Sequence, residues 1–357
     1  MKVGIVSADR LHPSVTPDNL AHWGGSGWAR IGKYSTHLKY DHVVGRLVWH
    51  YTELKIEDDN QTLHEVDVII MQRMMNEGLA YHVKKAREQG QVIINDVDDW
   101  YWGLDTTNNA WKASHPKHNP KENINHYKSI LAASDFITVS TPYLYDKMSK
   151  WNKNVVMFPN TVDTKAFIKH DHAEKEYVYV GWAGSTAHRS GDLQTMAGVL
   201  LQLTTTQSTT TQVRYLHGGS HSNSPHFADE VKVPKDSVDL LPLCDPQDYP
   251  KLLKMDIGIA PLSKKPFNEA KSEIKLLEYS ASGIPWVASA SDSYVRLSQA
   301  WNAGRIAHRP YEWLRHLREL IGSRQLRIEE GERLYELVRT RDITHGIAQW
   351  NEILTSL

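Results

Sequence analysis

Short apolar runs alternate with stretches of helical period along the whole chain. In the first half the runs are almost continuously apolar, which is typical of parallel strands covered on both faces. The expected strands are Lys2–Ser7, Val43–Val48, Asp67–Met71, Gln91–Asn95, Phe136–Ser140 and Asn154–Phe158. Helical periods fall between several of them, as at Glu77–Gln89 and Glu122–Ala133. This alternation predicts a doubly wound α/β domain.

The second half repeats the pattern after the polar stretch Asn160–Glu176, which has no sustained apolar period. Its expected strands are Tyr177–Trp182, Val213–His217, Val238–Leu241, Ile257–Pro261 and Trp286–Ser289. Its expected helices are Asp192–Leu203, Tyr249–Met255, Lys271–Ser282 and Tyr311–Ile321. We therefore expect a first domain over residues 1–165 and a second over residues 166–340. The last residues, 341–357, carry a further helical period.

The stretch Lys271–Ser289 is predicted to be a capped helix followed by a buried strand. Ser272 suits the N-cap, Gly283 suits the position just after the helix, and Pro285 stands where the helix can no longer continue.

Three charged residues gather toward the start of this expected helix. Lys271, Lys275 and Glu278 are spaced four and three residues apart, so they share one helical face. Two cations and a carboxylate beside the positive end of a helix predict a site that binds an anion and a hydroxyl group. The alternative is an ordinary solvated charged face.

A glycine-containing turn, Gly181–Ser185, follows one strand of the second half. Gly184 and Ser185 allow the backbone to approach a phosphate closely, and His188 and Arg189 add side-chain donors for a diphosphate. The alternative is a tight turn that binds nothing. The motif lacks the six-residue dinucleotide fingerprint, which argues against NAD. Gly218 follows the next strand and is a candidate for lining a base pocket.

Acidic and aromatic residues follow a strand of the first half in Asn95–Trp100. Asp98 and Asp99 are candidates for binding acceptor hydroxyl groups or transferring a proton. The alternatives are an aspartate N-cap and a Mn²⁺ or Mg²⁺ site. Trp100 and Trp102 are candidates for stacking on a sugar or a base.

His115 and His118 have a spacing that metal ligands sometimes show. No cysteine or carboxylate accompanies them at zinc-like spacing, so we expect no metal there. His118 is instead taken as part of an acceptor-binding loop, with a plain surface as the alternative.

Composition narrows the class of protein. The 357 residues are 40% hydrophobic and 23% charged with a net charge of −1, so no overall field draws the chain to nucleic acid or anionic lipid. The single cysteine, Cys244, fits a reducing compartment. No signal peptide and no membrane-spanning run is expected, which points to the cytoplasm and to no integral membrane contact.

Five segments together resemble glycosyltransferases of the family 4 type, which have the GT-B architecture. They are Ser134–Met148, Phe158–Asp163, Val180–Leu193, Met255–Leu262 and Lys271–Ser289. The resemblance implies two Rossmann-like domains facing across a cleft, with the final helix, 341–357, returning to the first domain. It also implies a nucleoside-diphosphate sugar as co-substrate, retention of anomeric configuration, and no metal or other cofactor.

The resemblance assigns further roles. Glu278 matches the family's glutamate that binds the ribose hydroxyls, and Gly24 and Gly25 match its glycine-rich loop, which closes on the donor phosphates. The family's upstream glutamate position is Ala270 here, so the sugar contact departs from the pattern.

The same comparison extends to two neighbouring segments. The loop Ser263–Ala270, with Lys264 and Lys265, matches a loop that contacts the donor, and solvated lysines are the alternative. Lys271 and Ser272 are assigned to the donor site, while Lys275 and Arg189 would stabilise the leaving diphosphate.

The expected reaction is transfer of a sugar to an acceptor hydroxyl of a glycan, a protein side chain or a hydroxymethylated base of viral DNA. Two alternatives remain: a nucleotide-sugar epimerase of the same fold, and a nucleotide-sugar-binding protein without turnover.

Overall fold

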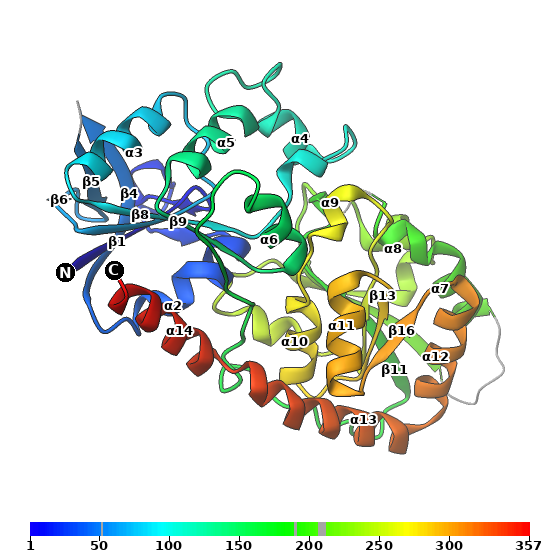
Figure 1. Cartoon of the computed structure of the whole chain (residues 1–357). Coiled ribbons are helices and arrows are strands. Elements are labelled where there is room, and N and C mark those ends of the chain that lie inside the picture. The colour runs from blue at the N-terminus through cyan, green and yellow to red at the C-terminus, as the bar shows by residue number, and fades with distance from the viewer. Residues whose placement is uncertain (51–52, 189–190, 206–211) are drawn as a thin grey trace. The chain divides into compact units, whose positions relative to one another are not determined.

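A computed structural model describes residues 1–50, 53–188, 191–205 and 212–357, without the side chains of His50, His188 and Thr205. The chain forms two compact units, described separately below (Figure 1). Unit 1 comprises Met1–Asn160 together with Ile343–Leu357, and unit 2 comprises Thr161–Asp342. No helix among the described residues is long and apolar enough to cross a membrane.

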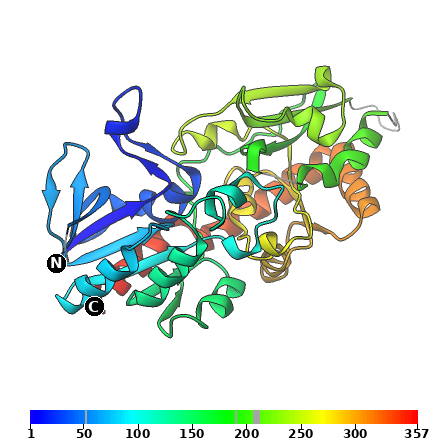
Figure 2. The same ribbon diagram turned by 90° about the horizontal axis from the view of Figure 1, so that it is seen from above.

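Unit 1 is built on an eight-stranded sheet in the order β10-β9-β8-β7-β1-β4-β5-β6. Its parallel strands are β1 (Lys2–Ser7), β4 (Asp41–His50), β7 (Val68–Gln72), β8 (Val92–Val97), β9 (Phe136–Val139) and β10 (Val155–Met157). All six were predicted from their apolar runs. The antiparallel strands β5 (Glu53–Asp58) and β6 (Leu63–His64) extend the sheet beyond β4 and were not predicted (Figure 2).

Helices cover both faces of this sheet. One face packs on α3 (Leu79–Glu88) and α5 (Ile124–Ala133), and α4 (Asn109–Ser114) and α6 (Pro142–Met148) follow in the same half of the chain. On the other face lies a helical segment made of α1 (Gly25–Gly27), the π-helical turn η2 (Trp28–Gly32) and α2 (Lys33–Ser35). A small hairpin of β2 (Arg10–Leu11) and β3 (His22–Trp23) precedes that segment.

The terminal helix α14 (Ile343–Thr355) belongs to unit 1, as the resemblance implied (Figure 1). The fully buried Trp350 packs on Phe158, with ring centroids 4.9 Å apart. Gln349 donates a hydrogen bond to the Met157 carbonyl at 2.6 Å. The chain therefore returns to its first domain because an apolar helix face completes the core there.

Unit 2 is built on a six-stranded parallel sheet in the order β13-β12-β11-β14-β15-β16. Its strands are β11 (Tyr177–Ala183), β12 (Gln212–Ser220), β13 (Val238–Pro242), β14 (Ile257–Ala260), β15 (Trp286–Ser289) and β16 (Arg305–Ala307). Only the short edge strand β16 was not predicted, because it is too short and polar to show a period.

Two helical layers enclose this sheet. One contains α7 (Ala197–Thr205), α8 (Phe227–Val231) and α12 (Pro310–Gly322), and the other contains α10 (Ile274–Ala281), α11 (Asp292–Trp301) and α13 (Arg324–Leu337).

Three expected helices have different bounds or types. The helix expected over Lys271–Ser282 begins only at Ile274, after the short α9 (Pro266–Glu269). The one expected over Asp192–Leu203 starts as the 3-10 helix η5 (Leu193–Met196). The one expected over Tyr249–Met255 is the 3-10 turn η7 (Tyr249–Leu252). In the last case the chain leaves the helical conformation at Leu253, whose φ and ψ are −87° and 74°.

Both sheets reverse their strand order at one point. In unit 1 successive strands lie on opposite sides of β1, so the reversal falls between β1 and β7. In unit 2 it falls between β11 and β14. Ligands of open α/β sheets bind outside the carboxyl ends of the strands at such points, which directs attention to the residues that follow these strands.

Candidate functional site

The turn after β11 occupies the reversal point of unit 2. Gly184 has a φ of +144°, a backbone conformation that favours glycine, and its N–H donates to the Gly218 carbonyl at 2.8 Å. The ends of β11 and β12 are thereby tied together. Gly184, Ser185 and Gly218, predicted to bind the donor, thus lie at or directly after these two strand ends.

Lys275 reaches this turn from α10. Its ammonium donates to the Ala183 carbonyl and, at 3.3 Å, to the hydroxyl of Tyr249. The ammonium also lies 5.3 Å from the centroid of the Trp182 ring. A Cβ placed on Gly184 would lie 3.7 Å from Lys275 Nζ, so the cation stands directly beside the glycine turn. The structure therefore brings together Lys275 and Gly184, two residues far apart in the sequence.

His217, on β12, contacts the same turn through a hydrogen bond to its backbone. Its side chain is buried, its Nε2 bonds to the Gly184 carbonyl at 2.9 Å, and its ring stacks on Trp182 with centroids 5.5 Å apart. Burial lowers the pKa of His217, and Lys275 lowers it further. A neutral ring is therefore the donor that holds the Gly184 carbonyl.

The start of α10 differs from the prediction. Glu273, not Ser272, is the N-cap residue, so Ser272 and Lys271 precede the helix. The Glu273 carboxylate forms an ion pair with Arg341 at 2.5 Å and makes no hydrogen bond to the helix N–H groups.

Lys271 therefore does not share the helical face of Lys275. Its ammonium lies 4.5 Å from the centroid of the Phe267 ring. Glu278 follows Lys275 on α10 and is half-buried. Ala270, at the position of the family's upstream glutamate, is fully buried, whereas the adjacent Glu269 is exposed.

Two predicted residues cannot be placed with the others. Arg189 and the side chain of His188 lie outside the described residues, although the backbone of Thr186–His188 forms the 3-10 turn η4. Their assignment to the donor site stays a prediction.

In unit 1 Asp9, the second residue after β1, fixes the glycine segment. Asp9 accepts hydrogen bonds from the N–H of Gly27 at 2.9 Å and, through its carbonyl, from the N–H of Gly24. A Cβ on Gly24 would lie 2.2 Å from the Asp9 carboxyl carbon, whereas one on Gly25 would meet nothing within 4 Å. The glycine-rich loop expected at Gly24 and Gly25 is therefore the start of helix α1, and the Asp9 carboxylate holds it in place.

A buried ion pair lies beneath this segment and was not predicted. Arg30 donates from Nε and Nη2 to the two oxygens of Asp96, at 2.9 and 2.7 Å. Its Nη1 donates to the Phe158 carbonyl and to Asn160, both at 2.8 Å. The ion pair anchors the end of β8, from which Asp98 and Asp99 project. No local motif links Arg30 to Asp96, which are 66 residues apart in the sequence.

Asp98 is the most perturbed acid of this group. Its Oδ1 is buried without a hydrogen-bond partner among the described residues, and its carboxylate accepts from the Ser26 hydroxyl. Burial, then the charge of Asp99, raises the pKa of Asp98 to about 6, and Arg73 opposes the shift. Near neutral pH such a carboxyl group can both donate and accept a proton.

Arg73 is a functional candidate that sequence reasoning missed. It follows β7, forms an ion pair with Asp9 at 3.1 Å, and lies 5.4 Å from the centroid of the Tyr101 ring. Its φ is +61°, an uncommon conformation for a residue with a side chain. The ends of β1, β7 and β8 thus supply one cation and several carboxylates at the reversal point of unit 1.

The predicted aromatic residues form a packed cluster. Trp100 stacks on Trp151 with centroids 5.7 Å apart, and Lys147 Nζ lies 5.3 Å from the Trp100 ring centroid. Trp102 lies parallel to Tyr127, also at 5.7 Å. The three tryptophans are half-buried and Tyr127 is fully buried, so much of the surface of these rings already contacts protein.

His118 belongs to a different group. Its ring lies 5.0 Å from that of Trp111 on α4, and His115 stacks on the same tryptophan at 4.5 Å. The structure therefore brings Trp100 and Trp102 together but places His118 with other partners.

Among the described residues, one group has the composition of a metal site: His170, His172 and Asp256. Asp256 already accepts from His170 Nε2 at 2.8 Å, from the Tyr179 N–H at 2.8 Å and from Lys175 at 3.4 Å. With these donors present, the group is explained as a hydrogen-bonded support for the segment before β11.

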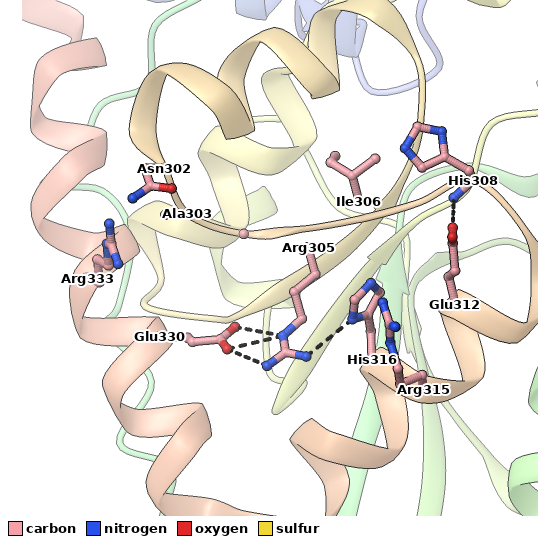
Figure 3. A pocket seen from close by; sticks show the side chains of 11 residues that line it. Asn302, Ala303, Arg305, Ile306, His308, Glu312, Arg315, His316, Glu330 and Arg333 are labelled. Atoms are coloured by element: carbon pink, nitrogen blue, oxygen red, sulfur yellow. Dashed lines mark hydrogen bonds and ion pairs between the residues drawn. The ribbon is translucent and has the colours of Figure 1, made fainter.

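A cavity of about 530 Å³ lies along the edge strand β16 (Figure 3). Arg305 is held there by the Glu330 carboxylate at 2.6 Å, and Glu312 accepts from the N–H of His308 at 2.6 Å. The cavity is lined by none of the residues predicted for the site. Its acidic groups are satisfied by these neighbours, so it carries no ligand assignment.

No family model and no curated protein matches the sequence. Solved structures do match it over its whole length. The Anabaena protein HepE in complex with UDP and glucose is 12% identical, covers 100% of both chains and has a TM-score of 0.67. A glycosyltransferase from Rickettsia africae is 13% identical over 99% of this chain and 97% of its own, with a TM-score of 0.64.

Sucrose-phosphate synthase from Thermosynechococcus elongatus is 13% identical over 99% of this chain and 98% of its own, with a TM-score of 0.63. At such low identities the likeness establishes the fold. The chain has the GT-B fold, which confirms the architecture expected from the sequence.

Proposed function

We propose that this protein is a glycosyltransferase that moves a sugar from a nucleoside-diphosphate sugar to an acceptor hydroxyl group. The observation that carries the proposal is the position of Lys275 beside the Gly184 turn, at the strand-order reversal of unit 2. The Anabaena protein HepE, whose fold matches this one, binds UDP and glucose in its solved structure, and this supports a nucleotide-sugar donor.

The donor's diphosphate would bind at the turn after β11. Negative charge builds on the diphosphate as its bond to the anomeric carbon breaks, so a fixed cation and oriented N–H groups lower the barrier. We assign this role to Lys275, Arg189 and the N–H groups of Gly184 and Ser185. Glu278, on the same helix as Lys275, would accept hydrogen bonds from the ribose hydroxyls.

The acceptor would bind to unit 1. Asp98 and Asp99 would hold its hydroxyl group, and the raised pKa of Asp98 suits a group that exchanges a proton during transfer. Arg73, held by its ion pair with Asp9, would place a positive charge near the Asp98 carboxylate. Transfer with retention and without a metal completes the proposal, and a glycan, a protein side chain or a modified base are the acceptor classes to test.

A nucleotide-sugar-binding protein without turnover is the second candidate. It is favoured by Ala270, which is fully buried at the position where the resembling family has a sugar-binding glutamate. Release of sugar from a bound donor, with or without an acceptor, would separate the two functions.

The first test is a thermal-shift panel of nucleoside diphosphates and nucleotide sugars. A ligand that binds only the native state raises the melting temperature in proportion to ln(1 + [L]/Kd). We expect Lys275→Met to lose this response, since methionine keeps the packing on Trp182 but removes the charge. Lys254→Met, at an exposed lysine of the same unit, is the matched control.

Two results would contradict the proposal. One is a parent protein that responds to no nucleoside diphosphate. The other is a Lys275→Met variant that responds as the parent does.

A further inference from the structure

Two histidines and an aspartate gather at the amino ends of the strands of unit 2. They are His170, His172 and Asp256, and one ligand atom of each lies within 4.8 Å of the others. Asp256 directly precedes β14, and its Oδ2 accepts from the N–H of Tyr179 near the start of β11. The Gly184 turn follows the other end of β11, so this group and the proposed donor site lie at opposite ends of the strands.

Hydrogen bonds account for Asp256, but they leave one buried atom of His172 without a partner. His172 is 3% exposed, and its Nε2 bonds to the Gly283 carbonyl at 2.9 Å. A carbonyl only accepts, so Nε2 carries a proton and donates it. In the neutral ring the other nitrogen, Nδ1, then has a lone pair. Nδ1 is buried and has no hydrogen-bond partner among the described residues, and a metal ion is one partner that would use its lone pair.

The surroundings of His172 are typical of a histidine that binds a metal. Such a histidine usually donates its second ring N–H to a backbone carbonyl or a carboxylate, which fixes the tautomer and the direction of the ring. Gly283 provides this carbonyl. A Cβ on Gly331 would lie 2.2 Å from the Gly283 carbonyl oxygen and 3.1 Å from His172 Nε2, so α13 packs closely on this contact. The lone pair of Nδ1 is therefore held in one direction.

His170 and Asp256 supply the other two ligands. His170 Nε2 donates to Asp256 Oδ1 at 2.8 Å, and the His170 ring lies edge-on to that of His172, with centroids 4.6 Å apart. Imidazole nitrogens and carboxylate oxygens are ligands of Zn²⁺, and the ion can replace the proton between His170 and Asp256. A Zn²⁺ ion with three protein ligands holds water in its fourth position.

Lys175 competes with an ion for the carboxylate. Its ammonium lies 3.4 Å from Asp256 Oδ1, the oxygen that also accepts from His170. The side chain of Lys175 is 35% exposed, whereas that of Asp256 is 2% exposed. The lysine can therefore turn into solvent when an ion takes the carboxylate oxygen, but its charge still opposes ion binding.

We propose that His170, His172 and Asp256 form a Zn²⁺ site that links the segment before β11, the start of β14 and, through Gly283, the turn after α10. Without the ion, the hydrogen bonds described above hold the group together. With it, the ion replaces one proton and stabilises the native state, which alone presents the three ligands together. The inference is independent of the proposed function, because the donor turn lies at the other end of the strands.

The first test is Zn²⁺ binding to protein treated with a chelator and then freed of it by gel filtration. Calorimetry should show one tightly bound Zn²⁺ per chain, and the ion should raise the melting temperature. Because the chain has 19 histidines, variants decide where the ion binds. His172→Gln keeps a side-chain N–H for the Gly283 carbonyl but removes Nδ1, and it should raise the Kd of Zn²⁺ at least about tenfold. His118→Gln, at an exposed histidine of unit 1, should leave Kd unchanged.

Lys175→Met should give the opposite result, tighter binding. Removal of the neighbouring positive charge should lower the Kd of Zn²⁺ about threefold or more. A damaged fold cannot produce such a gain. Lys254→Met, at an exposed lysine of the same unit, is the matched control and should leave Kd unchanged.

Several results would overturn the inference. They are a parent that binds no Zn²⁺, a His172→Gln variant that binds it as the parent does, an unchanged Kd in Lys175→Met, and a loss of binding in His118→Gln, which would place the ion on unit 1. Melting temperatures without metal show whether each variant is folded. If His172→Gln does not fold, the comparison of Lys175→Met with Lys254→Met decides. These titrations contain no nucleotide, so the proposed function stands or fails by its own tests.

Discussion

Arg30 holds Asp96 with two parallel hydrogen bonds, of 2.9 and 2.7 Å, in the core of unit 1. Both side chains are buried, at 1% and 0% exposure, and the Thr138 hydroxyl also donates to Asp96 at 2.7 Å. Breaking such a pair leaves one charge buried without its partner, which is where its stability cost arises.

Arg30→Met should therefore destabilise the protein by about 3 kcal/mol or more. Urea unfolding followed by fluorescence measures the change in free energy of unfolding. The control is Arg46→Met, since Arg46 pairs with Glu57 on the surface with 49% of its side chain exposed. That variant should change the free energy by less than about 1 kcal/mol. Equal effects of the two substitutions would refute the assignment.

Asp98 should make stability depend on pH between its ordinary pKa of 3.8 and its raised value of about 6. The native state binds this proton more tightly than the unfolded state, so the native state loses relative stability as pH rises through that window. The full loss is at most about 3 kcal/mol.

Asp98→Asn removes this titration. The variant should be favoured over the parent progressively from pH 4 to pH 7, with no further change above pH 8. Unfolding free energies of both proteins across this range provide the test. A constant difference would show that the pKa of Asp98 is not raised.

The proposed ribose contact of Glu278 predicts a loss that depends on the ligand's hydroxyl groups. Glu278→Gln should raise the Kd of the bound nucleoside diphosphate about tenfold, because a charged acceptor is replaced by a neutral one. The 2′,3′-dideoxy form of the same nucleotide lacks the hydroxyls and should bind parent and variant alike.

Glu269→Gln is the control for that experiment, since Glu269 is the exposed glutamate beside Ala270. It should leave the Kd of both nucleotides unchanged. Equal weakening of the normal and dideoxy nucleotides by Glu278→Gln would exclude a ribose contact.

Neighbouring glycines of unit 1 should respond very differently to the same substitution. In Gly24→Ala the new methyl group would meet the Asp9 carboxyl group, so we expect a loss of about 1–3 kcal/mol in the free energy of unfolding. Gly25→Ala meets no atom and should change stability by less than about 0.5 kcal/mol. Chemical denaturation of the two variants tests this, and similar losses would mean that Asp9 does not confine Gly24.

The prediction from sequence succeeded where the signal is local. Val68–Gln72 and Ile257–Ala260 are buried throughout, and a continuous apolar run shows this without any knowledge of their neighbours. Gly283 has a φ of +63° directly after α10, as its place behind a helical period indicated.

Failures occurred where a distant residue changes a local preference. Ser272 has the chemistry of an N-cap, but the N-cap residue is Glu273, whose carboxylate is paired with Arg341. No sequence motif marks Arg73 and Asp9 as a pair. They form an ion pair only because the ends of β7 and β1 are neighbours in the sheet.

By itself, the sequence determined the two α/β sheets, the last helix and the glycine turn after β11, since each depends on the spacing of apolar and glycine residues along the chain. The return of that helix to unit 1 was implied only by the family resemblance. Only the tertiary structure decided which charged groups meet: Arg30 with Asp96, Lys275 with the Gly184 turn, and Arg73 with Asp9. The physical reason is that such contacts join residues brought together by the sheets, and no local spacing records which strand ends will be neighbours.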